Sequence, residues 1–259
     1  MISKNCIKFI HSLESKKNRK REGLFVAEGP KVVGDMMGHF GLHTLIATSS
    51  WLKAHHDETN AAGGCRDKEC PLVMTATEEE LRKVSFLQHP QQVLAVFRLP
   101  EAYGLDDVRP ESHLYLALDG VQDPGNLGTI IRIADWFGIE AVICSHESAD
   151  AYNPKVVQAT MGSLARTRVI YTDLNEWLDK HDNIPVYGTL LDGEDIYRQS
   201  LSDHGIIIMG NEGNGISPSI RERVNRKLLI PDFHEGDTAD SLNVAIATAI
   251  TCSEFRRRR

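Results

Sequence analysis

Short apolar runs alternate along the whole chain with stretches in which apolar residues follow a helical spacing. In the first hundred residues the runs predict strands at 24–27, 44–47, 72–74 and 93–97. Residues 1–22 predict one basic amphipathic helix, and further helices are expected at about 30–40 and 77–87. This alternation is typical of a small α/β unit.

A second alternating series begins at 113, after a polar stretch at 101–112 that we expect to be a linker. It predicts strands at 114–118, 141–144, 167–171, 186–190, 206–209 and 227–230. These runs are almost entirely apolar, as in parallel strands that helices cover on both faces. We therefore expect two α/β domains, 1–100 and 113–259, the second built on a parallel sheet.

Two helices of the second half border the polar loops. One is predicted to begin at Asn126, a good N-cap residue, and its apolar stripe leaves Arg132 pointing away from the core. The other covers 242–255, with Ser241 as a candidate N-cap, and is apolar almost all round. A helix of this kind must be buried on most sides, which favours a homodimer.

Charge is distributed unevenly along the chain. The formal net charge is −7, yet residues 1–31 carry eight Lys and Arg against three Glu. A local basic patch determines affinity for phosphates more than the global charge does. We therefore expect RNA contacts from Lys16, Lys17, Arg19 and Lys20, although a solvated, solubilising face would have the same composition. Whether the arginines at 256–259 contact RNA is left open.

Several classes are disfavoured. No apolar run is long enough for a membrane span, and the start of the chain lacks an apolar signal core, so a cytoplasmic protein is expected. The five cysteines are few and scattered, which favours reduced thiols. Cys65 and Cys70, with His55 and His56 nearby, lack the regular spacing of a zinc site, and no metal is expected.

The glycines lie in an unusual place for an α/β enzyme. The loop 123–128, after the first strand of the second half, lacks the G-x-G-x-x-G of dinucleotide oxidoreductases. Glycines cluster instead at 210–215, after the strand at 206–209. A cofactor is therefore expected near the C-terminal part of this domain, where strand ends bring bare backbone close to a ligand.

Three stretches, in this order, resemble the motifs of the SpoU (TrmH-type) RNA ribose 2′-O-methyltransferases: 118–132, 207–216, and 229–231 with 241–245. The resemblance covers roughly 113–259. It implies a SPOUT domain in which the C-terminal chain forms a deep trefoil knot, a homodimer, and methyl transfer from S-adenosylmethionine (SAM) to a ribose 2′-OH. Residues 12–29 resemble the substrate-binding domain of the ribosomal-RNA members, which implies an N-terminal α/β RNA-binding domain and ribosomal RNA as substrate.

The resemblance also implies roles for individual residues. Arg132 would position ribose and phosphate, while Glu212 would orient Arg132 and Asn126, with Asn243 completing the catalytic set. The residues implied in cofactor binding are Gly210, Ile230, Leu242, Ser241, Thr189 and Gly215. No metal is required, because a sulfonium is already an activated leaving group. The acidic loop at 232–240 is longer than is usual in the family.

Two alternatives share the implied fold. One is a transfer-RNA 2′-O-methyltransferase, and the other is a non-catalytic RNA-binding or ribosome-assembly factor. Loss of Arg132 or of the glycine loop would favour the second alternative, and both features are present. The methylated nucleotide and the general base are not determined by the sequence.

Overall fold

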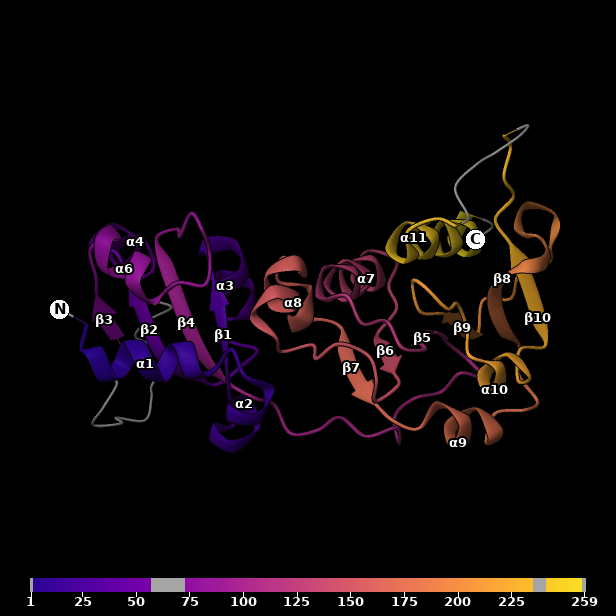
Figure 1. Ribbon diagram of the computed structural model, residues 1–259, viewed down its shortest axis with the longest axis horizontal. Helices are drawn as coiled ribbons and strands as arrows, with labels where there is room; N and C mark the ends of the chain where they lie inside the picture. Colours follow the sequence, from indigo (N-terminus) through magenta and orange to yellow (C-terminus); the bar gives the residue numbers. More distant parts are fainter. Residues whose placement is uncertain (1, 57–72, 235–240, 258–259) are drawn as a thin grey trace. The chain divides into compact units, whose positions relative to one another are not determined.

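The computed structural model describes residues 2–56, 73–234 and 241–257. Its contacts divide the chain into two compact units (Figure 1). One unit comprises the residues up to 101 together with 150–165, and the other comprises 102–149 and the residues from 166 onward. The segment 150–165, which the sequence pattern groups with the second half, thus has its contacts in the first unit.

The first unit is built on a mixed four-stranded sheet in the order β1-β4-β2-β3. Its strands are β1 (Leu24–Glu28), β4 (Val93–Arg98), β2 (Leu42–Ala47) and β3 (Val73–Thr75). Strand β4 pairs antiparallel with β1 and β2, whereas β2 and β3 are parallel. The strands therefore form where the apolar runs predict them, and residue 72 lies outside the described part of the chain.

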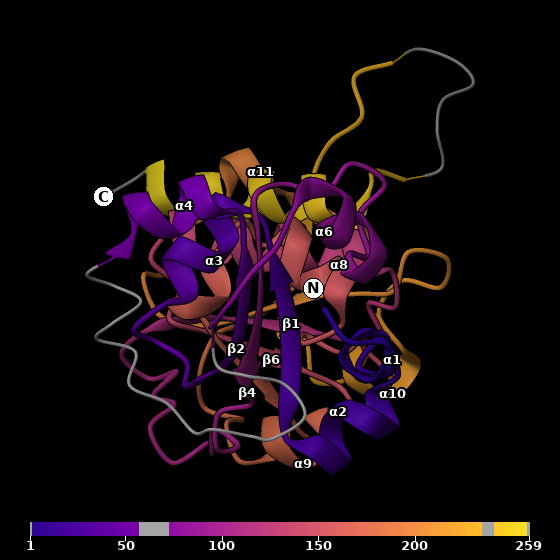
Figure 2. The same ribbon diagram turned by 90° about the vertical axis from the view of Figure 1, so that its left-hand side faces the viewer.

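Helices cover both faces of this sheet. The helices of the unit are α1 (Lys4–Ser12), α2 (Lys16–Glu22), α3 (Pro30–Met36), α4 (Ser49–Ala54), α6 (Glu78–Val84) and α8 (Pro154–Ala159). Apolar residues of α1 and α6 form one core cluster with β1, β2 and β4. Figure 2 shows α1 and α6 on one side of the strands and α3 on the other.

The single helix predicted at 1–22 is wrong, because the chain breaks into α1 and α2. Leu13 at the break is fully buried, and Arg19 of α2 turns inward to donate to the carbonyls of Leu13 (2.8 Å) and Glu14 (2.6 Å). These carbonyls would be without helical partners at the end of α1. The break is therefore stabilised by a residue that the sequence pattern places on an exposed basic face.

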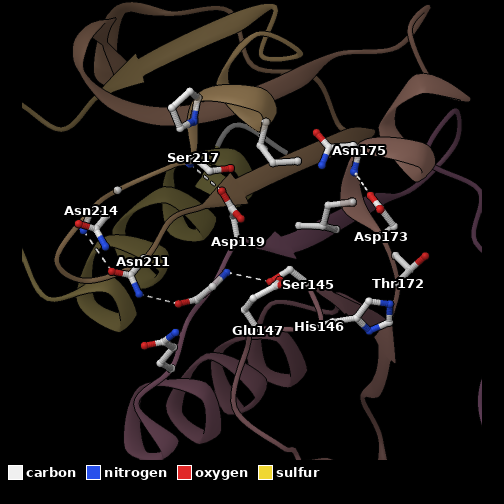
Figure 3. A pocket seen from close by; sticks show the side chains of 16 residues that line it. Asp119, Ser145, His146, Glu147, Thr172, Asp173, Asn175, Asn211, Asn214 and Ser217 are labelled. Atoms are coloured by element: carbon white, nitrogen blue, oxygen red, sulfur yellow. Dashed lines mark hydrogen bonds between the residues drawn. The ribbon is translucent and has the colours of Figure 1, made fainter.

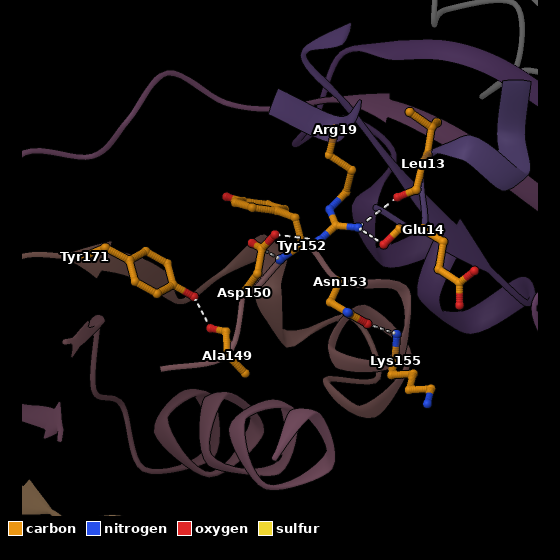
Figure 4. A network of polar contacts seen from close by, with 9 residues as sticks. All are labelled: Leu13, Glu14, Arg19, Ala149, Asp150, Tyr152, Asn153, Lys155 and Tyr171. Carbon is orange, nitrogen blue, oxygen red and sulfur yellow. Dashed lines mark hydrogen bonds and ion pairs between the residues drawn. The ribbon is translucent and has the colours of Figure 1, made fainter. Parts of the chain in front are cut away.

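The segment 150–165 is held to the first unit by the same arginine. Arg19 forms an ion pair of 2.6 Å with Asp150, and the two side chains are 2% and 17% exposed (Figure 4). The ring of Phe25 in β1 packs at a tilt against the ring of Tyr152, with centroids 5.0 Å apart. Gly162 has φ +95°, and a Cβ there would lie 2.4 Å from Asp35 Oδ2. Close approach and a left-handed backbone both require glycine at this position.

The second unit contains a six-stranded sheet in the order β10-β8-β9-β5-β6-β7, and its strand pairs are all parallel. The strands are β5 (Leu114–Leu118), β6 (Ala141–Cys144), β7 (Arg168–Tyr171), β8 (Val186–Asp195), β9 (Gly205–Met209) and β10 (Arg226–Leu229). The predicted parallel sheet is confirmed. Residues of β5, β6 and β9 are buried throughout, as expected for inner strands.

The helices of this unit are α7 (Pro124–Trp136), α9 (Leu174–Asp179), α10 (Pro218–Arg221) and α11 (Val244–Arg257). Helices α7 and α11 contact each other on one side of the sheet, and α9 and α10 lie on the other (Figure 1). Arg256 of α11 donates to the carbonyls of Phe137 (2.8 Å) and Gly138 (3.2 Å), just after α7 ends. One residue of the basic tail therefore has a structural role.

Both predicted helix starts in this unit need correction. Asp123, not Asn126, is the N-cap of α7, because its carboxylate accepts the Asn126 N–H at 2.8 Å. Asn243, not Ser241, caps α11 and accepts the N–H groups of Ala245 (2.9 Å) and Ile246 (3.3 Å). In both cases a better-placed Asx side chain takes the capping role.

Candidate active site

The candidate site lies at one edge of the parallel sheet. Strands β10, β8, β9 and β5 are successive neighbours, so their carboxyl ends and the loops that follow share this edge. Ligands of open α/β sheets bind outside the carboxyl ends of the strands. Asn126 follows β5, Glu212 follows β9, and Asn243 ends the long connection after β10. The three sequence motifs therefore meet at the same edge.

Asn126, Glu212 and Asn243 form a chain of hydrogen bonds. The Asn126 side chain donates from Nδ2 to Glu212 Oε1 at 2.9 Å. Its Oδ1 accepts from Asn243 Nδ2, also at 2.9 Å. The Oδ1 atom of Asn243 in turn accepts hydrogen bonds from backbone N–H groups at the start of α11. In each of the two side-chain amides, both the nitrogen and the oxygen are thus hydrogen-bonded. These bonds fix the orientation of Asn126 between the two other motifs.

The glycine loop after β9 folds back on itself. Asn211 and Gly215 exchange two backbone hydrogen bonds of 2.9 Å each. A Cβ on Gly210 would lie 2.2 Å from the carbonyl carbon of Gly215 and 2.3 Å from the nitrogen of Ile216. No side chain fits there, because these are backbone atoms of the same loop. The close approach leaves bare backbone at the strand end, as predicted for a cofactor loop.

Two residues that were not predicted from the sequence hold this loop in place. Asn211 donates to the Gly120 carbonyl at 2.7 Å and accepts the N–H groups of Gly213 (2.9 Å) and Asn214 (3.1 Å). Asp119 accepts the Ser217 N–H at 2.7 Å. A signal for both was present, because Asp119 comes one residue and Asn211 two residues after a fully buried strand. The loop after β9 is therefore tied to the loop after β5.

The other residues expected to bind the cofactor follow neighbouring strands. Thr189 lies on β8, and its hydroxyl contacts the Met209 sulfur at the end of β9 at 3.7 Å. Ile230 follows β10 and is partly buried. Ser241 and Leu242 precede α11 and are exposed, Leu242 by 51%. Part of the acidic loop, residues 235–240, lies outside the described residues.

Arg132 lies on α7 and is exposed. Within the described residues no hydrogen bond or ion pair holds its guanidinium, so Glu212 contacts Asn126 but not Arg132. Arg132 is six positions after Asn126, which places them about 120° apart around the helix. Arg132 instead shares a helix face with Trp136, whose side chain is 84% exposed.

The basic residues of α2 differ in exposure. Lys16, Lys17 and Lys20 are exposed, as a phosphate-binding face requires. Arg19 is 1% exposed and has its partners inside the first unit. The expectation that Arg19 contacts RNA is therefore corrected, since a buried guanidinium paired with Asp150 is a structural residue.

The described cysteines offer no reactive thiolate. Burial raises the pKa of Cys252 to about 12, despite Arg256 nearby, and burial also raises the pKa of Cys144. Both thiols therefore stay protonated at neutral pH. The expectation of free thiols fails for Cys6, which is disulfide-bonded, whereas Cys65 and Cys70 lie outside the described residues.

The described part of the chain contains no group of three or more His, Cys, Asp or Glu residues arranged to hold a metal ion. None of its helices is long and apolar enough to span a membrane.

Two similar solved structures are described as RNA methyltransferases. A SAM-bound rRNA methyltransferase from Sinorhizobium meliloti is 31% identical, with TM-score 0.86, over 100% of this chain and 96% of that one. A chain from Porphyromonas gingivalis, assigned to the TrmH family of RNA methyltransferases, is 41% identical, with TM-score 0.84 and full coverage of both chains. The fold and the site thus define a SAM-dependent RNA methyltransferase.

Sequence comparison identifies the family. Residues 113–253 match the SpoU rRNA Methylase family, and residues 4–95 match the MRM3-like substrate binding domain. The 23S rRNA (guanosine(2553)-2′-O)-methyltransferase RlmP of Bacillus subtilis is 32% identical over 94% of this chain and 93% of that protein. The chain belongs to the SpoU rRNA methylase family, and the predicted activity, SAM-dependent methyl transfer to a ribose 2′-OH of RNA, is confirmed.

Proposed function

We propose that this chain methylates a guanosine ribose of large-subunit ribosomal RNA. One observation carries the proposal: the similarity to the Bacillus subtilis 23S rRNA enzyme extends over 94% of the chain, through both the catalytic and the substrate-binding regions. Transfer-RNA members of the family often lack the substrate-binding domain, so its presence here favours ribosomal RNA. Because ribosomal RNA is the substrate, we expect the protein to act in the cytoplasm.

The cofactor pocket is proposed at the carboxyl ends of β8, β9 and β10. Backbone groups of Gly210 and Gly215 would hold SAM on one side, while Ile230 and Leu242 would cover the adenine with apolar atoms. Thr189 and Ser241 would supply hydroxyl groups at the rim. When bound there, SAM supplies a methyl group activated by its sulfonium. The residue set suits this ligand, because glycines leave backbone groups bare for polar contacts while Ile230 and Leu242 supply apolar atoms for a ring.

The hydrogen-bonded chain of Asn126, Glu212 and Asn243 is proposed to shape the acceptor side of the pocket. Glu212 and Asn243 fix the Asn126 amide from both ends, at 2.9 Å each. A rigid polar group of this kind can align the ribose hydroxyl in line with the methyl group that it accepts. As the O–CH₃ bond forms, the S–CH₃ bond of the sulfonium would break to leave a neutral thioether, and the hydroxyl proton would pass to solvent.

Arg132 is proposed to hold the ribose and its phosphate. It is exposed, and its guanidinium makes no hydrogen bond or ion pair within the described residues, so it is available for an anion. A guanidinium is a poor base, so its main contribution is to position the nucleotide and stabilise negative charge as the hydroxyl loses its proton.

A homodimer is part of the proposal. Trp136 of α7 is 84% exposed, and Ile246 and Leu242 at α11 are 53% and 51% exposed. Helices α7 and α11 contact each other, with Trp136 at the end of the pair near Arg256 and with Leu242 and Ile246 at the end near Asn126. Large apolar side chains that water would contact in a monomer thus lie at both ends of the helix pair. Since Arg132 shares a face with Trp136, the partner subunit would help to complete the RNA site. The trefoil knot implied by the family resemblance also remains a proposal.

Mapping of 2′-O-methyl groups on total RNA tests the substrate. RNA from cells with and without the gene would be compared by resistance of the modified sites to alkaline hydrolysis. We expect one site in large-subunit ribosomal RNA to lose its methyl group when the gene is absent. A lost mark in transfer RNA alone would replace the proposal with the transfer-RNA alternative.

A further inference from the structure

Beside the glycine loop, on the same edge of the parallel sheet as the proposed SAM pocket, lies a recess. It has a volume of about 420 Å³ and is bounded by the loops that follow β5, β6, β7 and β9 (Figure 3). Of the residues expected to bind the cofactor, Gly215 lines it at the rim, and the others do not. The recess is therefore distinct from the proposed SAM pocket, and the loop carrying Glu212 forms a shared wall.

The walls of this recess are held in place by hydrogen bonds. Gly120 N–H donates to Ser145 Oγ at 3.0 Å, while Asn211 and Asp119 bind backbone groups of the flanking loops at 2.7 Å each. Asp173 caps α9 by accepting the N–H groups of Asn175 and Glu176. Two of the three carboxylates in the wall thus already have backbone partners. A preformed recess of this size is suited to a small planar ligand.

The lining excludes phosphate as the preferred ligand. Its sixteen residues include neither Lys nor Arg, and three of them carry carboxylates. A ligand bound here must be neutral or must donate hydrogen bonds from N–H groups to the carboxylates of the lining. The rest of the lining is amide, hydroxyl and apolar, with Leu174, Pro218 and Ile220 contributing hydrocarbon surface.

Three groups in the recess are available to such a ligand. Glu147 and His146, adjacent on the loop after β6, are exposed, and their side chains have no hydrogen-bond or ion-pair partner within the described residues. Asn175 Oδ1 is buried and has no hydrogen-bond partner there either. A carboxylate and an amide oxygen are both acceptors, and an imidazole ring has a flat face. The recess thus offers two acceptors and one stacking surface.

We propose that this recess binds an unpaired nucleobase of the substrate RNA, next to the methylated nucleotide, and favours guanine. Unstacked bases in RNA are recognised by side-chain rings against their faces and by hydrogen bonds to their edges. Guanine presents N1–H and N2–H on one edge, which match the two oxygens of Glu147. Uracil has no amino group and meets the acceptors with a carbonyl on each side. The inference rests on the proposed activity on RNA.

Two variants and one control test the recess. Glu147→Gln removes the carboxylate, and His146→Ala removes the ring. Glu111→Gln is the control, because it removes the same charge from an exposed glutamate of the same unit, in the loop that precedes β5. SAM affinity should be unchanged in each of them.

The first measurement is a titration with free nucleosides, which does not depend on catalysis. Backbone amide NMR signals of the protein saturated with S-adenosylhomocysteine would be followed while guanosine or uridine is added. We expect guanosine to shift the amides of residues 146, 147 and 175, and uridine to shift none. Glu147→Gln should weaken guanosine binding roughly tenfold or more, a typical loss for a two-point base contact. Equal shifts with both nucleosides, or no shifts, would overturn the inference.

The second measurement is methyl transfer to ribosomal RNA from cells that lack the gene. We expect Glu147→Gln to lower kcat/KM for RNA by about ten- to hundredfold, mainly through KM, with Glu111→Gln at the wild-type value. Unchanged kcat/KM in both recess variants would show that the recess does not bind substrate RNA, even if guanosine binds. No transfer by the wild type would contradict the proposed function instead, and the titration would still decide the recess.

Discussion

Asn126 occupies the central position in the candidate site, because its amide joins Glu212 to Asn243. Asn126→Asp would replace the donor facing Glu212 by a second carboxylate. Two like charges within hydrogen-bonding distance cannot both ionise readily, so the pKa of one must rise. We expect methyl transfer at pH 8 to fall by roughly tenfold or more, because the acceptor side loses its fixed geometry.

Lowering the pH should partly restore the Asn126→Asp variant. Protonation of one carboxyl group gives back a donor between the two oxygens, so activity relative to wild type should rise from pH 8 to pH 6. Asn126→Ala, which has no titratable group, should show the same deficit at both pH values. Rates measured at saturating SAM and RNA would check this, and a parallel pH profile for both variants would contradict the assigned role.

Gly210 is required by the close approach of the loop after β9. In Gly210→Ala the new Cβ would meet backbone atoms of Gly215 and Ile216 at 2.2–2.3 Å, so the loop must move. We expect SAM affinity, measured by calorimetry, to fall by about tenfold or more. Gly213→Ala is the matched control, since its Cβ would lie 3.6 Å from Asn211 Oδ1, an ordinary contact. Equal affinities in the two variants would show that the loop does not bind the cofactor.

Sequence reasoning singled out Asn126, Glu212 and Asn243, whose side chains the structure brings together, but the capping role expected of Asn126 belongs to Asp123. A capping asparagine and a site asparagine look alike in sequence, because both follow a polar loop and precede a helix. The choice depends on whether Asp123 or Asn126 reaches the free N–H groups, which is a matter of backbone geometry. Arg19 was misassigned for a similar reason, since its partner Asp150 lies 131 residues away.

At the scale of elements, α2 is the proposed phosphate-binding helix. Replacing Lys16, Lys17 and Lys20 by Gln should weaken RNA binding and reduce the slope of log affinity against log salt by about 2, since each phosphate contact contributes about 0.7 for single strands. Arg19 is left unchanged because it supports the fold. Replacement of Lys31, Lys53 and Lys83, three lysines elsewhere in the same unit, is the control of equal charge.

Filter binding from low to high salt would compare the two triple variants. Full RNA affinity in the α2 variant, or the same loss in both, would contradict a specific role for α2. SAM affinity should be unaffected in either case, because the cofactor residues belong to the other unit.

Strands were predictable, whereas helix ends were not. An apolar run between polar loops is a local property, and each predicted strand of the described residues formed within a few positions of its run. The break between α1 and α2 was not predictable, because it depends on Arg19 reaching carbonyls at Leu13 and Glu14. When a side chain from beyond the break stabilises it, the spacing of apolar residues along the sequence does not reveal the break.

At the scale of the whole molecule, the exposed apolar side chains on α7 and at the start of α11 predict a dimer. Trp136→Glu would place a charge where the 84% exposed indole is expected to be buried by the partner. Sedimentation velocity at micromolar concentration should show a dimer for the wild type and mainly monomer for this variant. Val73→Glu, at an exposed valine of the other unit, should remain dimeric. A wild-type monomer would contradict the proposed assembly.

The division of the chain into two units could not be predicted fully from the sequence. Residues 150–165 follow β6 in sequence, and local patterns assign them to the second half. Their contacts with β1 and α3 belong to the first unit instead. These contacts depend on shape at Gly162 and on the Arg19–Asp150 pair, which no local pattern encodes. Family resemblance supplied the activity, but it could not supply this arrangement.

Product analysis after a reaction with methyl-labelled SAM tests the central claim most directly. Ribosomal RNA from cells that lack the gene would be incubated with wild type or Arg132→Ala, digested to nucleosides and separated by mass. We predict label in one 2′-O-methylnucleoside with the wild type. With Arg132→Ala we predict a rate at least about a hundredfold lower at saturating RNA, with SAM affinity retained. Label on a base, or equal rates for the two proteins, would contradict the account.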